Sequence, residues 1–431
     1  MHYSIHKRRN LCETLLTWYS PLMHSLLQKL GSVSAIIGAQ WGDEGKGKVT
    51  DILGEHYDVI ARACGGANAG HTIVVGGKKH VFRLLPAGCL HEGKPVILGS
   101  GMVIHLPTLL EELATLKTAG IDLIPRLMIS GGAHIVFDFH KQIDAVQEER
   151  REKGIGTTKK GIGPAYADKA TRAGIRIERL GDDLRKELEA RAWELKHIYD
   201  ITMDITAELD NLKKAHAVIG GNIVKNLPLL LRSFMEDDKK ILIEGAQATL
   251  LDLDYGTYPF VTSSYTTLAG ALQGLGIAPN RLTSCIGIAK AYCTRVGSGH
   301  FPAEDTSERG DRLRARGGEY GSVTGRPRRC GWLSIPDLLY SSCINGFTCI
   351  NLTKLDVLDE EDVIPVLTET TKDGSPVFVE MKGWKTSTAG IRAYKDLPAE
   401  ARAYIEFIEK SINVPVSIIG TGQPREDIIV R

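Results

Sequence analysis

The chain has 431 residues, and its 53 Lys and Arg almost balance its 52 Asp and Glu, leaving a formal net charge of +1. This balance argues against a protein that binds nucleic acid or a membrane surface through bulk charge. Hydrophobic residues make up 43% and charged residues 24%, values of an ordinary globular protein that exclude global disorder. No apolar run approaches the ~18 residues of a membrane span.

The eight cysteines are scattered, and none has the C-x-x-C or Cys/His spacing of a zinc site. We therefore expect reduced, mostly buried thiols in a cytoplasmic protein. Glycine is common, with 46 residues, about 11% of the chain against a typical ~7%. An excess without repeats predicts many tight backbone loops, from which phosphate sites are built.

Residues 1–32 differ from the remainder. They contain three consecutive basic residues at 7–9 and then a Leu-rich stretch that Pro21 and charged residues interrupt. With several basic residues and a single acid, this segment loosely resembles a transit peptide. Its apolar stretch is too interrupted for a secretory signal. We expect a loosely ordered extension over 1–32, or a start codon chosen too far upstream, and one folded domain over 33–431.

Apolar runs and helical periodicity alternate along that domain. Buried strands are predicted at Ser32–Gly38, Val59–Ala63, Val96–Leu98, Leu127–Ile129, Lys240–Glu244, Ser284–Ala289, Thr348–Leu352 and Val416–Ile419. Helices are predicted at Gly45–Leu53, Pro107–Ala119, Phe139–Lys153, Leu180–Tyr199 and Ala399–Ser411. The alternation predicts an α/β fold with a large, mostly parallel central sheet flanked by helices. The charged stretch from about 180 to 235 lacks strand signals and predicts a helical excursion.

The first Gly-rich loop, Gly42-Asp-Glu-Gly-Lys-Gly-Lys48, follows the first strand and opens the first helix. Glycines there let backbone N–H groups converge on a phosphate, and the helix N-terminus adds positive potential. The loop is similar to a P-loop, but Val49 replaces the metal-binding Ser or Thr. A carboxylate beside phosphates is repulsive unless it binds a metal or moves a proton. Asp43 is therefore a candidate Mg²⁺ ligand or general base.

A second loop, Cys64-Gly-Gly-Ala-Asn-Ala-Gly-His-Thr72, follows the next strand. Its glycines and Asn68 permit positive φ and close approach to a ligand. His71 could serve as a general acid or as a cation on a phosphoryl oxygen, although a lone histidine is more often structural.

These two loops resemble those of the adenylosuccinate synthetase family, and later blocks agree with that family in the same order. The blocks are Gly156-Thr-Thr-Lys-Lys-Gly-Ile-Gly-Pro-Ala-Tyr166, Glu244-Gly-Ala-Gln-Ala-Thr-Leu-Leu-Asp252, Gly256-Thr-Tyr-Pro-Phe-Val-Thr-Ser-Ser264, Thr294-Arg-Val-Gly-Ser-Gly299, Thr324-Gly-Arg-Pro-Arg-Arg329 and Leu352-Thr-Lys-Leu-Asp356. The resemblance extends over about residues 33–431. So many blocks in one order are far more specific than a single glycine motif.

The resemblance implies a P-loop-like GTP-binding core and a GTP-dependent ligase that joins IMP to L-aspartate. In the family the purine 6-oxygen attacks the γ-phosphoryl group of GTP, and the aspartate amine then displaces phosphate from 6-phosphoryl-IMP. Adenylosuccinate forms, in the first committed step from IMP to AMP in purine biosynthesis. One Mg²⁺ per subunit is implied.

The resemblance also implies residue roles. Asp43 would take the purine N1 proton and, with the carbonyl of Gly70, ligate Mg²⁺. His71 would stabilise the transferring phosphoryl group and donate a proton, and Gln247 is the third implied catalytic residue. The implied GTP-binding residues are Gly42, Asp43, Glu44, Gly45, Lys46, Gly47, Lys48, Gly70, His71, Thr72, Arg328, Lys354, Leu355, Asp356, Gly420, Thr421 and Gly422.

The other two substrates have their own implied residues. Those for IMP are Asp43, Lys46, Asn68, Ala69, Gly70, His71, Thr158, Arg172, Gln247, Thr262 and Arg326. Those for aspartate are Ser322, Val323, Thr324, Gly325, Arg326 and Arg328. Arg172 resembles an arginine that the family extends to the partner subunit's IMP, which implies a homodimer. Neither nucleic acid nor membrane is an expected partner.

Guanine selection has a physical basis at Asp356. A carboxylate can accept from both guanine N1–H and the exocyclic amine, a donor pair that adenine lacks, which allows rejection of the wrong base by about 10⁴-fold. The stem of Lys354 can pack on the base. Read alone, this tetrapeptide indicates no more than a strand-end salt bridge.

Seven arginines lie between Arg309 and Arg329. They could bind RNA, but few aromatic residues are interleaved for base stacking. Carboxylate binding suits them better, because arginine binds carboxylates bidentately. Three residues depart from the pattern common in relatives, namely Ser100, Pro327 and Ser334.

Four functions remain open from the sequence. The ligase leads, and the alternatives are a related GTP-dependent enzyme acting on another oxo-purine or amine, a GTP-binding paralogue without coupled turnover, and a nucleic-acid-binding protein.

Overall fold

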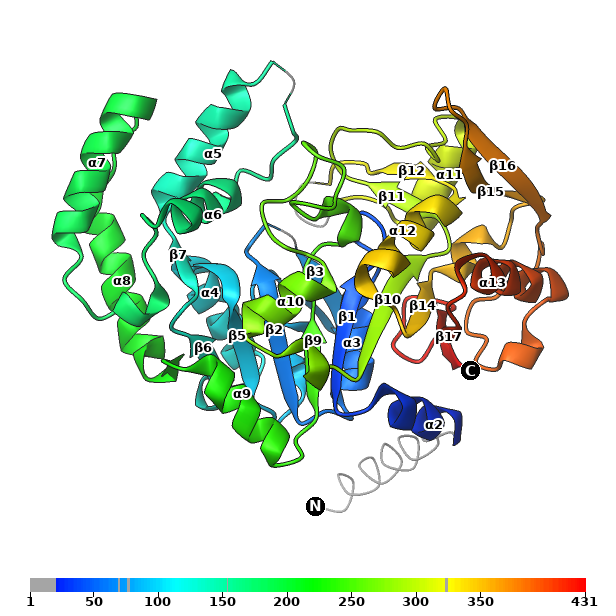
Figure 1. The fold of residues 1–431 in the computed structure, drawn as a ribbon, viewed down its shortest axis with the longest axis horizontal. Coiled ribbons are helices and arrows are strands. Elements are labelled where there is room, and N and C mark those ends of the chain that lie inside the picture. Colours follow the sequence, from blue (N-terminus) through cyan, green and yellow to red (C-terminus); the bar gives the residue numbers. More distant parts are fainter. Residues whose placement is uncertain (1–20, 69, 76–77, 153, 322–324) are drawn as a thin grey trace.

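The structure is a computed structural model that describes residues 21–431 except 69, 76–77, 153 and 322–324. An eleven-stranded sheet lies at its centre (Figure 1). In spatial order its strands are β18 (Ile428–Val430), β17 (Val416–Gly420), β14 (Cys349–Thr353), β10 (Ser284–Lys290), β1 (Val33–Gly38), β9 (Ile241–Glu244), β2 (Val59–Gly65), β5 (Val96–His105), β6 (Leu127–Ser130) and β8 (Ile223–Val224), with β7 (His134–Val136) paired to β5. Every pairing in this sheet is parallel except β17 with β18.

Three small sheets adjoin it. They are β3 (His71–Val75) with β4 (Lys78–Phe82), β11 (Cys293–Arg295) with β12 (Arg329–Gly331), and β13 (Leu333–Ser334) with β15 (Val363–Thr370) and β16 (Pro376–Lys382). The described helices are α2 (Pro21–Leu30), α3 (Lys46–Gly54), α4 (Leu106–Thr118), α5 (Asp138–Arg150), α6 (Ile162–Thr171), α7 (Arg185–Tyr199), α8 (Ile205–Ile219), α9 (Leu227–Glu236), α10 (Leu268–Leu275), α11 (Glu308–Gly317), α12 (Ile335–Asn345) and α13 (Ala399–Ile412).

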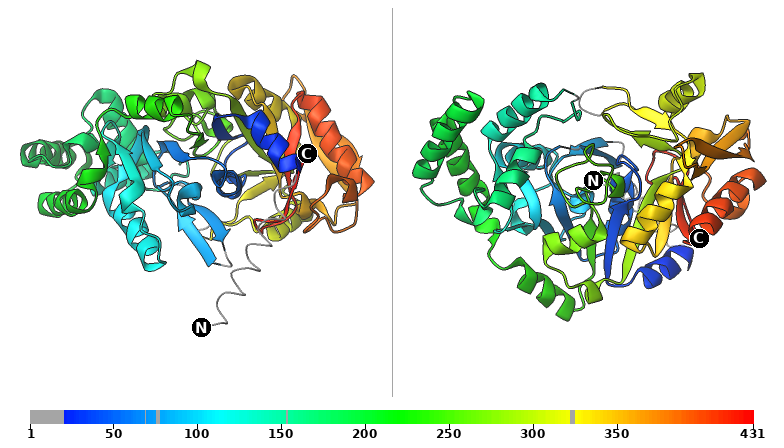
Figure 2. Two further views of the ribbon diagram at one scale, coloured as in Figure 1. Left: turned by 90° about the horizontal axis from the view of Figure 1, so that it is seen from below. Right: turned by 45° about the horizontal axis from the view of Figure 1, so that its top comes forward.

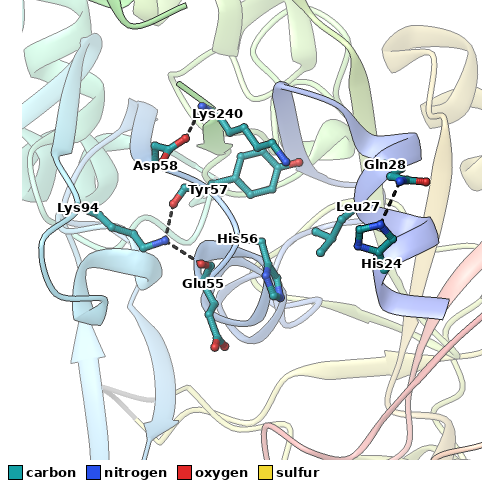
Figure 3. Close-up of a pocket in the computed structure, with 9 residues that line it drawn as sticks. All are labelled: His24, Leu27, Gln28, Glu55, His56, Tyr57, Asp58, Lys94 and Lys240. Carbon is teal, nitrogen blue, oxygen red and sulfur yellow. Dashed lines mark hydrogen bonds between the residues drawn. The ribbon is translucent and has the colours of Figure 1, made fainter. Parts of the chain in front are cut away.

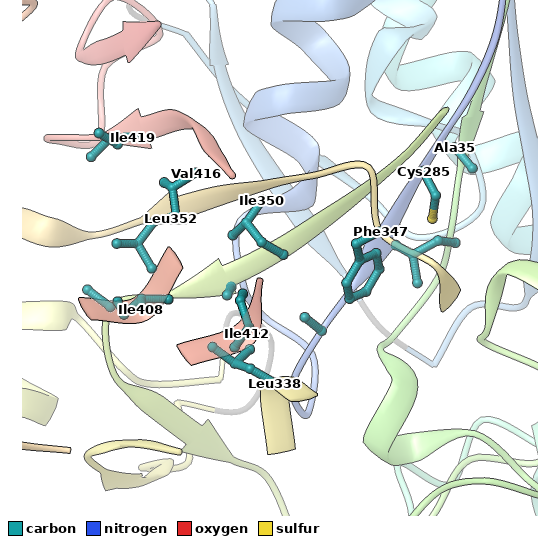
Figure 4. Close-up of a cluster of buried hydrophobic side chains, with 14 of the residues drawn as sticks. Ala35, Cys285, Leu338, Phe347, Ile350, Leu352, Ile408, Ile412, Val416 and Ile419 are labelled. Carbon is teal, nitrogen blue, oxygen red and sulfur yellow. The ribbon is translucent and has the colours of Figure 1, made fainter. Parts of the chain in front are cut away.

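The central strands are buried on both faces. In β1, Val33, Ala35 and Ile37 belong to one hydrophobic cluster and Ile36 to another, as the alternation of side chains along a strand requires. The first cluster includes residues of α10, α12 and α13, and the second includes residues of α2 and α3. Figure 4 shows part of the first cluster, with Ile350 and Leu352 of β14 near Ile408 and Ile412 of α13. The predicted α/β fold with a mostly parallel central sheet is confirmed.

Helices α7 and α8 lie at one end of the molecule and α13 lies at the other (Figure 2). A separate cluster of buried residues, which includes Leu188 of α7 and Leu209 and Leu212 of α8, joins these helices to α4 and β6. The helical excursion is thus confirmed in outline. It contains one strand that the sequence did not predict, because β8 has only two residues.

Strand β5 runs to His105, seven residues beyond the predicted end at Leu98. Gly99 and Gly101 interrupt the apolar pattern, which hides the continuation. The glycines are required by close packing, because a Cβ on Gly101 would lie 2.3 Å from the carbonyl oxygen of Ala63 and 2.8 Å from Cα of Gly274 in α10.

Two further predicted boundaries need correction. The helix predicted from Leu180 begins at Arg185. Residues 21–30, placed by the sequence in a loosely ordered extension, form helix α2, which buries Met23, Leu26, Leu27 and Leu30 against the sheet side that carries α3. Burial of these apolar side chains stabilises α2. The interruptions in the apolar pattern made this helix hard to predict. Residues 1–20 lie outside the described part of the chain.

The thiols agree with expectation. Of the seven cysteines in the described residues, all are free and only Cys343 is exposed. Within the same residues no helix combines the length and the apolar character that crossing a membrane requires.

Glu208 of α8 makes stability depend on pH. Its buried carboxylate accepts a hydrogen bond of 2.8 Å from the backbone N–H of Asp138, and burial, with the nearby Asp138 charge, raises its pKa to about 7. An acid with a raised folded pKa costs stability as pH rises from its unfolded pKa, near 4.5, to the folded value. We expect Glu208→Gln to unfold at a higher temperature than wild type at pH 8, with the advantage vanishing near pH 4. A pH-independent difference in melting temperature would contradict this.

Candidate active site

Most of the predicted site residues that the structure describes lie at one edge of the central sheet. The loops after β1, β2, β9, β14 and β17 carry them, and these parallel strands point their carboxyl ends to the same edge. In open α/β sheets this edge is where ligands bind. Motifs hundreds of residues apart in the sequence are thereby brought together.

The loop after β1 is shaped by Glu44. Its Oε1 accepts the backbone N–H groups of Gln40 at 3.2 Å and Gly42 at 2.8 Å, and its Oε2 forms an ion pair of 2.6 Å with Lys46 Nζ. The Glu44 side chain is fully buried. Because this carboxylate is used within the loop, Glu44 can meet a nucleotide only through its backbone. Gly45, at φ 92°, then caps α3, and Gly47 is buried in that helix.

Asp43 is the other carboxylate of the loop, and it faces outward. Its side chain is 33% exposed, and its Oδ2 lies 2.8 Å from Nε of Arg328, an ion pair that joins this loop to the Arg-rich segment. The backbone of Asp43 is left-handed, with φ 59°. The loop thus keeps one acid for its own structure and presents one to a reactant.

Lys48, in the first turn of α3, connects the loop to the C-terminal segment. Its Nζ donates hydrogen bonds of 2.9 Å to the carbonyl oxygens of Gly422 and Asp427. Burial lowers its pKa to about 8, although Asp427, Asp356 and Glu426 act in the opposite direction. Thr421 is buried, and Gly420 ends β17 beside Thr353.

The segment after β14 holds an unsatisfied acceptor. Asp356 Oδ1 is buried and has no hydrogen-bond partner among the residues that the structure describes. Burial also raises the pKa of this carboxyl. A buried acceptor in this condition is costly unless a ligand donates to it, so Asp356 has the property that guanine recognition requires. Leu355 beside it is buried in the core.

Lys354 has its ammonium group anchored within the protein. Its Nζ donates to the carbonyl oxygen of Gly317 at 2.7 Å and to Glu319 Oε1 at 2.6 Å. The stem of Lys354 is therefore the part of this side chain that remains for the predicted packing on a base.

Asn68, Gln247 and Thr262 come together from three loops. Gln247 Nε2 donates to Asn68 Oδ1 at 3.0 Å, and Asn68 Nδ2 donates to Thr262 Oγ1 at 3.5 Å. Gln247 Oε1 is buried without a hydrogen-bond partner within the described part of the chain. Three residues implied for IMP thus form one hydrogen-bonded group, in which Gln247 Oε1 remains available to accept a hydrogen bond from a ligand.

The remaining predicted residues lie on separate segments of the chain. Thr158 is exposed after α5, and Arg172 is exposed at the end of α6. Gly325 and Arg326 are exposed, and the carbonyl of Arg326 accepts the N–H of Gly321 at 2.9 Å. Ala69, Ser322, Val323 and Thr324 lie outside the described residues. The backbone of His71 and Thr72 begins strand β3, directly after Gly70.

Sequence reasoning missed two carboxylates that organise these loops. Glu319 is buried and binds Lys290, Tyr292, Lys354 and Arg328. A signal existed, because few acids stand among the seven arginines of that segment. The second is Asp252, which accepts the backbone N–H groups of Asp254, Tyr255, Thr266 and Thr267 and so ties together the loop that carries Thr262.

The three departures from the family pattern have structural uses. Ser100 Oγ and Ser130 Oγ lie 2.7 Å apart. Ser334 caps α12 by accepting the N–H of Asp337. Pro327 pairs with Tyr320 in an isolated antiparallel bridge.

A cavity of about 290 Å³ lies elsewhere, between α2 and residues 55–58 near the amino end of β2 (Figure 3). Its lining mixes charges of both signs, and Lys94 Nζ is already bound to the carbonyl oxygens of Glu55 and Tyr57. It does not join the groups described above.

Residues 35–429 match the adenylosuccinate synthetase family. The chain belongs to this family. Adenylosuccinate synthetase of Dictyostelium discoideum is 46% identical over 423 residues, which cover 92% of this chain and 99% of that protein. The enzyme of Thermodesulfovibrio yellowstonii is 43% identical, with 93% and 99% covered. The solved structure of fully ligated adenylosuccinate synthetase from Plasmodium falciparum is 43% identical and has a TM-score of 0.89. The match covers 93% of this chain and 100% of that one.

Proposed function

We propose that the chain is a ligase that joins IMP and L-aspartate to form adenylosuccinate, with GTP as co-substrate, in the synthesis of AMP. Membership of the family supports this proposal. One structural observation supports the assignment of roles to particular residues. Asp43, Arg328, Glu319 and Lys354 form an unbroken chain of ion pairs across the sheet edge. These ion pairs link Asp43, the candidate proton acceptor, to the segment that carries Asp356.

The proposed chemistry has two steps. The N1 proton of IMP passes to Asp43, the 6-oxygen attacks the γ-phosphorus of GTP, and GDP leaves. The amine of aspartate then attacks C6, the C6–O bond breaks, and phosphate leaves with that oxygen. His71 would stabilise the transferring group and donate a proton. Most of the catalysis is positioning and neutralisation of charge.

Asp43 and the carbonyl of Gly70 would together hold a single Mg²⁺. Both are oxygen donors, and Mg²⁺ commonly takes one or two protein ligands beside substrate phosphates. The 33% exposure of the Asp43 side chain leaves its carboxylate open to such an ion. When bound, the ion would neutralise negative charge on the phosphates.

The other substrate contacts complete the proposal. Asn68, Gln247, Thr262 and Arg326 would hold IMP, and Arg326 with Arg328 would bind the carboxylates of aspartate. Arg172, exposed at the end of α6, would reach the partner's IMP in a homodimer. Reduced thiols agree with a cytoplasmic enzyme.

An omission assay tests this function. Purified protein with Mg²⁺, GTP, IMP and aspartate should release phosphate only when both co-substrates are present, and mass spectrometry should find adenylosuccinate. Hydrolysis of GTP without the co-substrates would favour a GTPase. A different product would favour an enzyme acting on another oxo-purine or amine.

GTP affinity should depend on the charge of Lys48. With a pKa of about 8, its ammonium group loses its proton as pH rises through 8, and a neutral amine attracts phosphates less. We expect the Kd for GTP, measured by calorimetry, to rise between pH 7 and 9 with a limiting slope of about tenfold per pH unit. Lys48→Met should bind GTP weakly at pH 7 and lack this dependence. A wild-type Kd that stays constant over this range would contradict the role of Lys48.

A further inference from the structure

Glu319 is a fully buried carboxylate between two halves of the proposed site. Its Oε1 accepts hydrogen bonds from Lys290 Nζ at 2.9 Å, Lys354 Nζ at 2.6 Å and the Tyr292 hydroxyl at 2.5 Å. Its Oε2 accepts one from Arg328 Nη1 at 2.7 Å. The four donors come from three separate stretches of chain, so one side chain joins β10, the end of β14 and the start of β12.

The charge of Glu319 is what makes this arrangement stable. Burial alone raises the pKa of a carboxyl, but Lys290 and Lys354, with hydrogen bonds from Lys354 and Tyr292, bring the pKa of Glu319 well below its usual value. Lys290 is also fully buried. Loss of the carboxylate charge would leave several cations in a region of low polarity without their counter-ion.

The two oxygens of Glu319 serve different parts of the site. Through Oε1 it holds Lys354, two residues before the unsatisfied Asp356. Through Oε2 it holds Arg328, whose Nε contacts Asp43. Arg328 therefore has two anchors. If Asp43 releases Arg328 in order to bind a proton or a metal ion, the ion pair with Glu319 still holds the Arg328 guanidinium in place.

We propose that Glu319 is a positioning residue that couples the guanine side of the site to Arg328 and Asp43. It makes the binding of GTP and the use of aspartate depend on one carboxylate that itself touches neither. Asn68, Gln247 and Thr262, which would hold IMP, have no bond to Glu319. Only the N1 contact of Asp43 would connect IMP to Glu319, through Arg328, so IMP binding should change least. This inference rests on the proposed function for the identity of the substrates.

The test compares Glu319→Gln with Glu361→Gln. Glu361 is a matched control, because it is also a buried carboxylate and binds two arginines, Arg309 and Arg316, of the neighbouring helix α11. In Glu319→Gln we expect the calorimetric Kd of GTP and the KM of aspartate each to rise about tenfold or more, while the KM of IMP stays within about twofold. Glu361→Gln should lower the melting temperature but leave all three constants within about twofold.

A second variant covers the case in which Glu319→Gln does not fold. Tyr292→Phe removes one neutral donor from Oε1 and leaves every charge in place. It should retain the wild-type fold and raise the GTP Kd and the aspartate KM by about two- to fivefold each, with the KM of IMP unchanged. The proposal is overturned if folded Glu319→Gln, or Tyr292→Phe when it alone folds, leaves GTP and aspartate unaffected. It is also overturned if all three substrates weaken equally.

The GTP Kd needs no turnover, so this test is separate from that of the function. A wild type that makes no adenylosuccinate would refute the ligase. The effect of Glu319→Gln on the GTP Kd would still decide whether Glu319 positions the guanine side.

Discussion

Asp43→Asn should reduce turnover by about 10³-fold or more while GTP and IMP still bind. The substitution removes the proposed proton acceptor and metal ligand together, and a positioned general base alone contributes about 10²–10⁴-fold in rate. Asparagine keeps the size of the side chain, and the loop is held in shape by Glu44 rather than by Asp43. Steady-state rates, with the Kd of each nucleotide from calorimetry, measure the two effects separately.

The matched control is Asp237→Asn, an exposed acid at the end of α9 that precedes the amino end of β9, whereas the loops of the site follow the carboxyl ends of the strands. It should keep wild-type rates. If Asp43→Asn retains more than about a tenth of wild-type turnover, Asp43 is neither base nor essential metal ligand. If it loses nucleotide binding entirely, the role of Asp43 is structural.

The second large effect is expected at Asp356. Asp356→Asn should weaken GTP by about 10²-fold or more and reduce the preference for GTP over ATP, because guanine loses one of two acceptors. An asparagine offers one acceptor and one donor, which matches xanthine, whose 2-oxygen replaces the guanine amine. The variant should therefore use xanthosine triphosphate better than wild type does.

Asp359→Asn is the control for that substitution. Asp359 lies three residues away and accepts from Trp384 Nε1 and the backbone N–H of Thr388, each at 2.7 Å. Its loss should lower stability and leave base preference unchanged. Unaltered discrimination between GTP and ATP in Asp356→Asn would refute the assignment of the guanine site.

The sequence predicted the loops well because each is a local pattern. A strand, a run of glycines and a helix start identify the segment of Gly42–Lys48 without knowledge of the remainder, and the parallel sheet then brings such loops to one edge. The same locality explains why Asp356 and Gln247 could be named from their motifs. Their unsatisfied buried oxygens are seen only in the structure.

The interactions between loops could not be predicted in this way. Glu319 meets Lys290 and Lys354, which are 29 and 35 residues distant, and nothing in the periodicity of those segments specifies the contact. Glu44 illustrates a related difficulty. Its position in a phosphate-type loop suggested a ligand contact, whereas its side chain is used to hold that loop together. Helix α2 was missed because its apolar face is short and surrounded by polar residues.

The fate of the purine 6-oxygen tests the central claim most directly. IMP labelled with ¹⁸O at position 6 would be converted with GTP, aspartate and Mg²⁺, and the released phosphate analysed by mass spectrometry. Because the C6–O bond breaks only after that oxygen has been phosphorylated, we predict that the label appears in inorganic phosphate, one atom for each adenylosuccinate formed. Release of the label as water, with unlabelled phosphate, would contradict the proposed mechanism.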